Sequence, residues 1–453
     1  MKEIKNDFTK GEVWRVIMRM ALPLMLAQLV NVLYSVVDRM YIGHIPGVGS
    51  LALTGLGLTM PIVSIVTAFA GLCGTGGGPL CSIARGEGKK QQAEEIMGNS
   101  FTLLLIFAVC LTLILEIFAK PILYAFGASD ATFPYAGEYV RIYLLGTVFV
   151  MISLGMNHFI NAQGFASVGM LTVAIGAVTN IVLDPIFIFV FDMGISGAAL
   201  ATVIAQAVSA VWALGFLLGK RAILDFKLKN MLLKASLVGR ILALGTTGFV
   251  MSITNALVQT ACNSQLQRFG GDNYVGAMTI INSIRELTFM AAHGLTAGAQ
   301  PVLGYNFGAA AYSRVKKGIR FVSSASFVYG LSIWLLVMIM PRTLASIFNS
   351  DPVLLAATER SMRIYFCGFF LMALQLAGQC VFVGLGKSRQ AVFFSLLRKA
   401  IIVTPLVLLL PYIPALGVEG VFWSEPISDL IGGGACFMTM YLTVYKKLPQ
   451  EIS

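Results

Sequence analysis

The sequence has 453 residues, of which 57% are apolar and only 12% are charged, and its formal net charge is +11. Because soluble domains carry roughly 25% charged residues, this composition excludes a soluble globular protein and predicts many membrane-spanning segments. The basic residues lie in short loops rather than on one soluble face, which argues against nucleic-acid binding. The seven cysteines lie in or beside apolar runs without metal-ligand spacing, and we expect free thiols.

The two halves of the chain repeat each other at an offset of 222 residues, which is the separation of Ala21 from Ala243. The Arg-Ile-Tyr tripeptide at 141–143 recurs at 363–365 with the same offset. Internal duplication in a very apolar chain is typical of membrane transporters, whose binding sites lie between the repeats.

Apolar runs of about 20 residues predict twelve membrane-spanning helices, six in each half. In chain order we expect them at 14–38, 51–78, 94–119, 137–161, 168–191, 196–218, 238–268, 273–303, 316–340, 360–384, 390–412 and 418–445. An even number of spans in each half makes the two repeats parallel. The prediction is an all-α polytopic membrane protein with a six-helix lobe at 1–218, a cytoplasmic linker at 219–237 and a second six-helix lobe at 238–453.

Lys and Arg residues gather in alternate loops, beginning with the N-terminal segment and including the basic stretch from Lys220 to Lys234. The loops on the opposite side carry far fewer of them. By the positive-inside rule, we expect both termini on the cytoplasmic side of the cell membrane of a prokaryote.

The first expected span carries a polar face at helical spacing, made of Gln28, Asn31, Ser35 and Asp38. A carboxylate at the membrane centre costs roughly 2.5–3.5 kcal/mol on insertion scales, so Asp38 is a candidate functional residue. The alternative is a helix-end residue at the outer interface. Pro23 lacks an N–H and lets the helix bend, which predicts a hinge, the alternative being a first-turn residue near the membrane surface.

The fifth and sixth spans also carry polar faces. They are made of Thr172, Gly176, Asn180 and Asp184 on the fifth span, and of Thr202, Gln206 and Ser209 on the sixth. The side-chain oxygens of Asp38, Asn180, Asp184 and Thr202 would suit a hard cation such as Na⁺. Two desolvated carboxylates close together would instead favour a bound proton. The alternative for Asn180 and Asp184 is a structural hydrogen bond between helices.

The second half does not duplicate these carboxylates, because Leu406 stands where the repeat would place Asp184. Its polar residues are Asn255, Gln259 and Asn263 on the seventh span, Asn282, Arg285 and Glu286 on the eighth, Arg398 and Lys399 on the eleventh, and Glu425 and Asp429 on the twelfth. We interpret the last four as a structural ion-pair network, the alternative being a substrate site. Ion coupling is thus expected in the first half alone.

Motifs for an ATP-driven pump or an enzyme are missing from the sequence. The stretch 383–388 resembles the end of a phosphate loop, but a Walker motif needs Gly at the position of Val381. The three histidines are scattered, and no catalytic dyad is recognisable. Transport is therefore expected to run on an ion gradient.

Several motifs resemble those of multidrug and toxic compound extrusion (MATE) transporters, in particular the prokaryotic DNA-damage-inducible branch. They are Ala21-Leu22-Pro23, the stretch 37–43 around Asp38, the glycine-rich run 76–88, and Asn180-Ile181-Val182-Leu183-Asp184-Pro185 with Gly197-Ala198-Ala199. The resemblance covers nearly the whole chain. It implies two six-helix lobes forming a V and export of organic, often cationic, drugs in exchange for H⁺ or Na⁺ by alternating access.

The resemblance also implies site residues. The family's cation site corresponds to Asp38, Asn180, Asp184 and Thr202, and Asn157 is similar to a further polar position of that site. The substrate cavity would draw on Gln28, Asn31, Gln206, Asn255, Gln259, Asn282 and Glu286. Carboxylates that some relatives place in the second lobe are missing here.

Two other functions stay open from the sequence. A flippase for lipid-linked saccharides, from the same superfamily, would need a basic cavity, for which Arg285, Arg398 and Lys399 are the candidates. An intramembrane enzyme would need a catalytic dyad. The expected partners are small-molecule drugs and the lipid bilayer, without nucleic acid or a resident cofactor, and the protein is expected to be a monomer.

Overall fold

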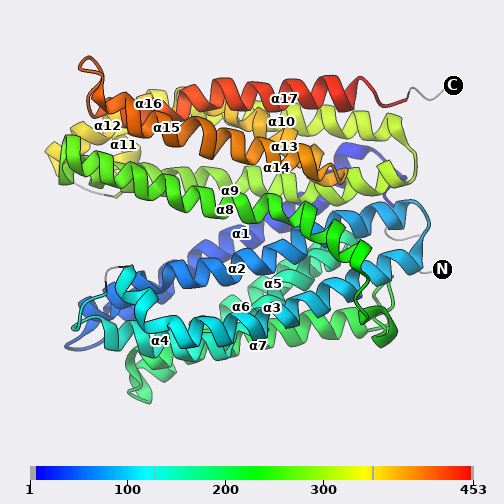
Figure 1. Cartoon of the computed structure of the whole chain (residues 1–453), viewed down its shortest axis with the longest axis horizontal. Helices are drawn as coiled ribbons and strands as arrows, with labels where there is room; N and C mark the ends of the chain where they lie inside the picture. The colour runs from blue at the N-terminus through cyan, green and yellow to red at the C-terminus, as the bar shows by residue number, and fades with distance from the viewer. Residues whose placement is uncertain (1–6, 127, 349–350, 450–453) are drawn as a thin grey trace. The chain divides into compact units, whose positions relative to one another are not determined.

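The computed structural model describes residues 7–126, 128–348 and 351–449, and every regular element within them is a helix. The helices of the first repeat are α1 (Val13–Gly43), α2 (Gly49–Gly86), α3 (Lys90–Ala125), α4 (Phe133–Leu145), α5 (Thr147–Ala162), α6 (Ala166–Pro185) and α7 (Gly194–Leu218), with a π-helix η2 (Ile186–Val190) after α6. A short 3₁₀ helix, η3 (Leu228–Met231), follows in the connection to the second repeat. Figure 1 shows these elements along the chain.

The second repeat begins with three long helices and ends with two spans broken by π-helical turns. Its elements are α8 (Ala235–Gly270), α9 (Asp272–Gly308), α10 (Tyr312–Ile339), α11 (Pro341–Ser346), α12 (Pro352–Phe366), α13 (Phe369–Gly384), α14 (Ser388–Leu396), η4 (Leu397–Val403), α15 (Thr404–Leu409), η5 (Leu410–Tyr412), α16 (Glu419–Ser428), η6 (Asp429–Gly433), α17 (Gly434–Met440) and η7 (Tyr441–Tyr445). The predicted all-α class is confirmed.

Within the described ranges, nine helices are long and apolar enough to span a membrane, or up to eleven if each of two bent pairs is one span. The pairs are α4 with α5, bent by 58°, and α12 with α13, bent by 47°. The breaks fall at Gly146 and at Gly368, which are 222 residues apart in the repeat. A Cβ at Gly146 would lie 2.7 Å from Cγ1 of Val203, so glycine lets α7 approach the bend. The eighth expected span corresponds to α9. This helix is 37 residues long, but it is less apolar than the nine helices that meet the criteria for a membrane span.

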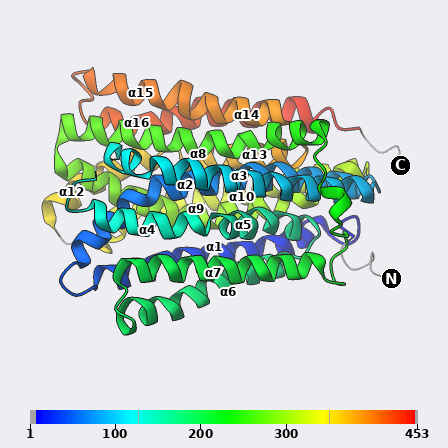
Figure 2. The same ribbon diagram turned by 60° about the horizontal axis from the view of Figure 1, so that its bottom comes forward.

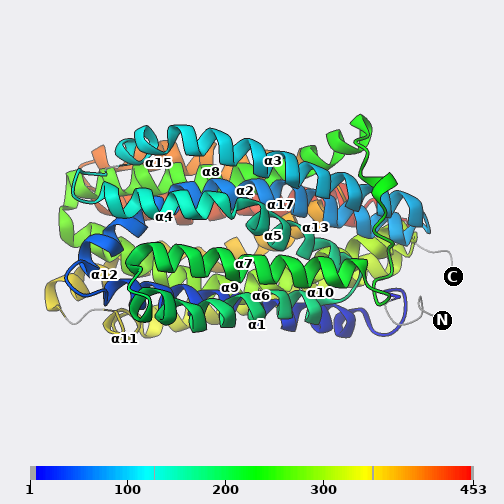
Figure 3. The same cartoon turned by 90° about the horizontal axis from the view of Figure 1, so that it is seen from below.

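The chain divides into two compact units. Unit 1 contains residues up to Asp7 and Leu22–Gly248, and unit 2 contains Phe8–Ala21 and Phe249–Ser453. In unit 1, α6 lies beside α7, as Figures 2 and 3 show, and α2 packs against both α3 and α5. In unit 2, α13 packs against α9 and α10.

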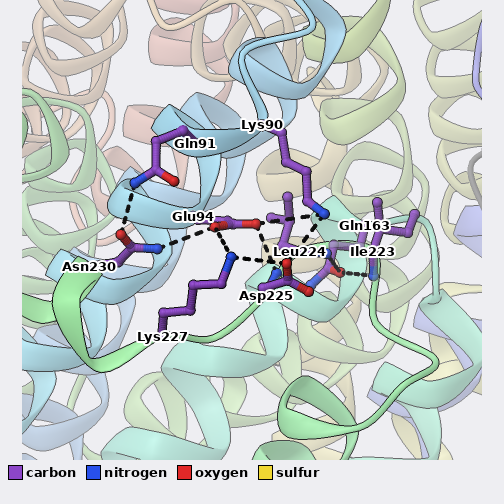
Figure 4. A network of polar contacts seen from close by, with 9 residues as sticks. All are labelled: Lys90, Gln91, Glu94, Gln163, Ile223, Leu224, Asp225, Lys227 and Asn230. Carbon is purple, nitrogen blue, oxygen red and sulfur yellow. Dashed lines mark hydrogen bonds and ion pairs between the residues drawn. The ribbon is translucent and has the colours of Figure 1, made fainter.

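The segment between the repeats is held on α3 and α5 by a polar network, which Figure 4 shows. Glu94 of α3 is buried, and its carboxylate accepts from the backbone N–H of Asp225 at 3.1 Å and from Nδ2 of Asn230 at 3.3 Å. Lys227 Nζ lies 3.6 Å from the same carboxylate. Gln163, at the end of α5, accepts from two further backbone N–H groups of this segment. This basic connection is therefore an ordered part of unit 1.

Candidate cation site

Four polar side chains of unit 1 converge from three helices. Asp38 of α1, Asn180 and Asp184 of α6, and Thr202 of α7 are all less than 10% exposed. Asn180 Nδ2 donates to Asp184 Oδ1 at 3.2 Å and to Thr202 Oγ1 at 3.3 Å. The carboxyl groups of Asp38 and Asp184 lie close enough to interact with each other. The structure thus brings together the four residues that the sequence singled out.

Three oxygens of this group lack a hydrogen-bond donor among the described residues. They are Oδ1 of Asp38, Oδ1 of Asn180 and Oδ2 of Asp184, and all three are shielded from solvent. Buried polar atoms in folded proteins are normally hydrogen-bonded, so unpaired acceptors mark a place for a ligand or a water. Two carboxylates, an amide oxygen and a hydroxyl are the donor set that a hard cation prefers. A proton held between the two carboxylates would also remove their mutual repulsion. The donor set therefore fits either Na⁺ or H⁺.

The helical spacing of α6 explains how this site forms. Thr172, Gly176, Asn180 and Asp184 recur every four residues and lie on the buried face of the helix. Gly176 allows close packing, because a Cβ at this position would collide with Oγ of Ser209 on α7. Pro185 ends α6 directly after the carboxylate, and the π-helix η2 follows. A proline at this point removes a backbone hydrogen bond and loosens the helix beside Asp184.

Three tyrosines lie near the site, and they were not predicted from the sequence. Tyr139 and Tyr143 of α4 are buried, and their rings stack with centroids 6.2 Å apart. The Tyr139 hydroxyl interacts with Thr202, and Tyr34 of α1 lies close to both carboxyl groups. Their hydroxyls give the apolar interior extra polar contacts beside the carboxylates. The spacing of Tyr139 and Tyr143, four residues apart in an apolar span, is the signal that could have revealed them.

Two other polar residues predicted in the first half, Asn157 and Gln206, have hydrogen-bond partners outside this group. Asn157 of α5 donates from Nδ2 to the carbonyl of Gly169 at 3.1 Å, near the start of α6. Gly169 precedes Asn180 by about three helical turns, or about 16 Å along the axis. The place of Asn157 in the cation site stays a prediction. Gln206 of α7 accepts a hydrogen bond from Ser153 at 2.6 Å.

The polar face of α1 extends along the helix to the carboxylate of Asp38. Gln28 and Asn31 are exposed on unit 1, and the carbonyl of Asn31 accepts from Ser35 Oγ at 3.0 Å. Pro23 lies inside α1, which runs without interruption from Val13 to Gly43. The hinge assigned to Pro23 and the substrate contacts of Gln28 and Asn31 stay predictions.

In unit 2, the predicted cavity residues of α8 and α9 form a chain of amides. Gln259 donates to Asn263 at 3.1 Å and accepts from Asn282 at 3.1 Å. Asn255 is half-buried on the same face of α8, one turn before Gln259, and Glu286 is exposed on α9. Neutral amides can meet varied donors and acceptors on a ligand without a fixed charge preference. These side chains stay candidates for contact with substrate.

The four charged residues of the last two spans form a buried ion-pair cluster in unit 2. Lys399 Nζ lies 2.6 Å from Glu425 Oε1, and Arg398 Nη2 lies 2.8 Å from Glu425 Oε2. Arg398 Nη2 is also 2.7 Å from Asp429 Oδ1. The cluster lies where the π-helices η4 and η6 interrupt their spans. The predicted pairing of these side chains is present, and their role stays an interpretation.

Comparison with known proteins identifies similar chains over the whole length. The MatE family model matches residues 23–186 and 248–409, one segment in each repeat. The multidrug export protein MepA of Staphylococcus haemolyticus (strain JCSC1435) is 25% identical over 439 residues, which are 96% of this chain and 94% of the relative. MepA of Staphylococcus aureus (strain NCTC 8325 / PS 47) is 26% identical and is covered to 95%.

Solved structures show the same fold. One is an outward-facing conformation of a multidrug resistance MATE family transporter of the MOP superfamily, with a TM-score of 0.90, 21% identity and coverage of 98% of this chain and 99% of the other. Another is a MOP superfamily transporter from Pyrococcus furiosus, with a TM-score of 0.90, 22% identity and coverage of 97% and 98%. At these identities the likeness establishes the fold.

Proposed function

Because the chain belongs to the MatE family of multidrug and toxic compound extrusion transporters, we propose that it exports organic, often cationic, drugs in exchange for H⁺ or Na⁺. It is a multi-pass membrane transporter for multidrug efflux and not an enzyme. The exchange of ions and the alternating opening of the two membrane faces are the proposed part. Both termini would be cytoplasmic, and the transporter would work as a monomer in the bilayer without a resident cofactor.

The observation that supports coupling most is the pair of buried carboxyl groups in unit 1. Asp38 and Asp184 lie close enough to interact, and each keeps one oxygen without a donor from the part of the chain that the structure describes. Leaving two desolvated negative charges together is costly, so the site favours one cation, either H⁺ or Na⁺. The coupling cation and a cationic drug would both be attracted to these two carboxyl groups, so they would compete for them.

Competition between the drug and the coupling cation leads to their exchange when the binding site opens alternately to the two sides of the membrane. A coupling cation that arrives from outside neutralises Asp38 and Asp184 and releases a cationic drug there, because the drug loses its counter-charges. The cation then leaves on the other side, which restores the carboxylates for the next drug. Each ligand shifts the conformational equilibrium only by its differential affinity for the two states.

Drug efflux from proteoliposomes tests this function. A proton gradient and a sodium gradient are imposed in separate experiments, and one of these gradients is expected to drive export by the wild-type protein. Asp38→Asn and Asp184→Asn should each abolish gradient-driven export. Asp192→Asn is the matched control, since Asp192 is exposed, eight residues beyond Asp184, and has a positive φ that Asn tolerates. Export at the wild-type rate by both site variants would contradict the coupling role.

The flippase alternative has less support, because two of its three basic candidates are occupied. Arg398 and Lys399 both pair with Glu425 inside unit 2. A pyrophosphate group would have to displace these buried ion pairs, which is unfavourable.

A further inference from the structure

The connection between the repeats carries exposed leucines among its lysines. In residues 227–234, lysines stand at positions 227, 229 and 234, and leucines at 228, 232 and 233. Leu228, the first residue of η3, is 82% exposed, and Leu232, which follows η3, is 74% exposed. Apolar side chains interspersed with lysines are typical of segments that lie at the boundary between lipid headgroups and acyl chains.

Contacts with α3 place this segment at the depth where that helix enters the apolar part of its span. Asn99 Nδ2 donates to the carbonyl of Leu232 at 3.1 Å, and Thr102 Oγ1 donates to the carbonyl of Met231 at 2.7 Å. From Phe101 to Leu115, α3 carries no charged residue. A hydrocarbon core of about 30 Å takes roughly 20 helical residues, so Asn99 and Thr102 lie at its edge. The exposed leucines therefore face acyl chains rather than water.

The backbone of η3 is held directly on α3. A Cβ at Gly98 of α3 would lie 2.6 Å from the carbonyl carbon of Asn230 and 3.1 Å from the backbone nitrogen of Met231, so only glycine allows this contact. Asn230 is buried, and its Nδ2 donates to Glu94 at 3.3 Å, as Figure 4 shows. Because Asn230 is fixed between the two leucines, the leucines stay exposed on the outer side of η3.

A basic pocket of about 740 Å³ lies beside this segment, at the first turn of α3 and the start of α8. Its lining includes Lys89, Lys90, Gln92, Glu95, Lys234 and Ser236. The three lysine side chains are each about half exposed and pair with Glu87 at 2.8 Å, Asp225 at 3.5 Å and Glu95 at 2.7 Å, respectively. A lysine ammonium has three N–H donors, so one carboxylate does not use them all. With three lysines and one glutamate in its lining, the pocket favours an anion.

Lys234 connects the pocket with the level of the leucines. Its backbone N–H donates to Asn99 Oδ1 at 2.7 Å, which places its main chain at the edge of the hydrocarbon core. Its Nζ lies 2.7 Å from Glu95, four residues or about 6 Å nearer the start of α3. The side chain thus extends from the acyl boundary toward the headgroup level, as lysines near a membrane surface commonly do. The ammonium groups and the leucines lie at the two depths that a phospholipid occupies.

We propose that the pocket and the leucines of η3 form a binding site for one anionic phospholipid of the adjoining leaflet. The lipid phosphate accepts from Lys89 and Lys234, and the acyl chains lie along Leu228 and Leu232. A soluble phosphate uses the lysines but gains nothing from the leucines, which favours a lipid. All of these residues belong to unit 1, so the site is complete within that unit. Lipid binding here goes beyond the proposed export and does not depend on it.

Native mass spectrometry of the purified protein in detergent tests the site with dioleoyl phosphatidylglycerol, which is anionic, and dioleoyl phosphatidylcholine, which has no net charge. The wild type should retain one phosphatidylglycerol more tightly than any phosphatidylcholine. Lys89→Gln with Lys234→Gln should weaken this binding by about 30-fold, since each basic residue near an anionic headgroup contributes about fivefold. Lys220→Gln with Arg221→Gln is the matched control, because it removes two exposed charges from the same connection outside the pocket.

The control variant should bind phosphatidylglycerol as the wild type does. Equal retention of the two lipids by the wild type, or equal losses in the two double variants, would overturn the proposal. The comparison of lipids on the wild type needs no variant, so it stands even where a substitution impairs folding.

Soluble phosphates distinguish a lipid from a free anion, because they carry the same charged group without acyl chains. Neither inorganic phosphate nor glycerol phosphate, at the concentration of the lipid, should displace phosphatidylglycerol. Leu228→Ser with Leu232→Ser should weaken lipid binding although all the lysines remain. Displacement by either soluble phosphate, or unchanged lipid binding by the serine variant, would overturn the assignment to a lipid.

A nitroxide label at position 232 tests the depth of the segment in liposomes that contain phosphatidylglycerol. In a protein whose seven native cysteines are replaced, the label on Leu232→Cys should be relaxed more by oxygen, which dissolves in acyl chains, than by a water-soluble nickel complex. The label on Lys220→Cys should show the reverse, because this exposed residue lies outside the pocket. Stronger relaxation by the nickel complex at both positions would overturn the placement of the leucines in lipid.

Discussion

At the scale of single residues, the hydroxyl of Thr202 is the most conservative probe of the cation site. Thr202→Val keeps the shape of the side chain but removes the acceptor that Asn180 uses at 3.3 Å. The loss of one hydrogen bond is worth about 1 kcal/mol, or about fivefold in affinity. We expect a weaker dependence of efflux on the coupling cation, by roughly that factor, with normal folding. An unchanged cation concentration at half-maximal efflux would exclude Thr202 from the site.

Glu425 offers a second residue-scale prediction, on stability. Glu425→Gln leaves Arg398 and Lys399 buried with one carboxylate fewer, and removal of one partner of a buried pair typically costs about 3–5 kcal/mol. The variant should unfold at clearly lower temperature or denaturant concentration in detergent. Glu419→Gln is the control, since Glu419 pairs with the exposed Arg360, and such a pair is worth at most about 1 kcal/mol. Equal losses in the two variants would show that the buried cluster is not structural.

The sequence predicted the residues of the cation site better than their surroundings. Asp38, Asn180, Asp184 and Thr202 could be found because polar side chains at helical spacing are costly in lipid and therefore conspicuous. The tyrosines near the site were missed because aromatic residues in spans are ordinary, and only tertiary packing shows which of them meet a carboxylate.

At the scale of helices, Gly76 is expected to matter for its lack of a side chain. Gly76→Ala places a methyl group against the backbone of α8, whereas Gly71→Ala, one and a half turns earlier on α2, meets nothing within 4 Å. Gly71→Ala should leave efflux unchanged or slightly stabilise the helix. Gly76→Ala should push α2 and the start of α8 apart and shift spin-label distances between these helices toward longer values. Identical distance distributions in the two variants would show that this contact tolerates a methyl group.

The connection between the repeats should loosen in acid. A hydrogen bond from Lys227 and the nearby charge of Lys90 lower the pKa of Asp225 below its usual 3.8. This stabilisation is therefore complete above pH 3.8 and is lost as the pH falls through the lower folded pKa. Amide exchange across 223–234 should accelerate in that window, and Asp225→Asn should remove the acid-dependent step. An equal step in the variant would assign it to another group.

At the scale of the whole molecule, the duplicated sequence predicted much of the architecture. The repeat and the apolar runs indicated two parallel sets of helices, and most helix boundaries lie within a few residues of the predicted ones. The bends at Gly146 and Gly368 were not predicted, because a continuous apolar run does not reveal a break. The sequence also did not predict that residues 8–21 belong to unit 2 and residues 235–248 to unit 1. This arrangement depends on close packing at Gly76 and Gly298, whose partners lie far away in sequence.

The central claim is that drug leaves in strict exchange for a cation bound at Asp38 and Asp184. Its most direct test is the reverse reaction, in which an imposed drug gradient drives ions across proteoliposomes that start without an ion gradient. The account predicts opposite movement of H⁺ or Na⁺, detected by an enclosed pH-sensitive or sodium-sensitive dye, and no such movement with Asp184→Asn. Drug flux through the wild-type protein without any accompanying ion flux would contradict it.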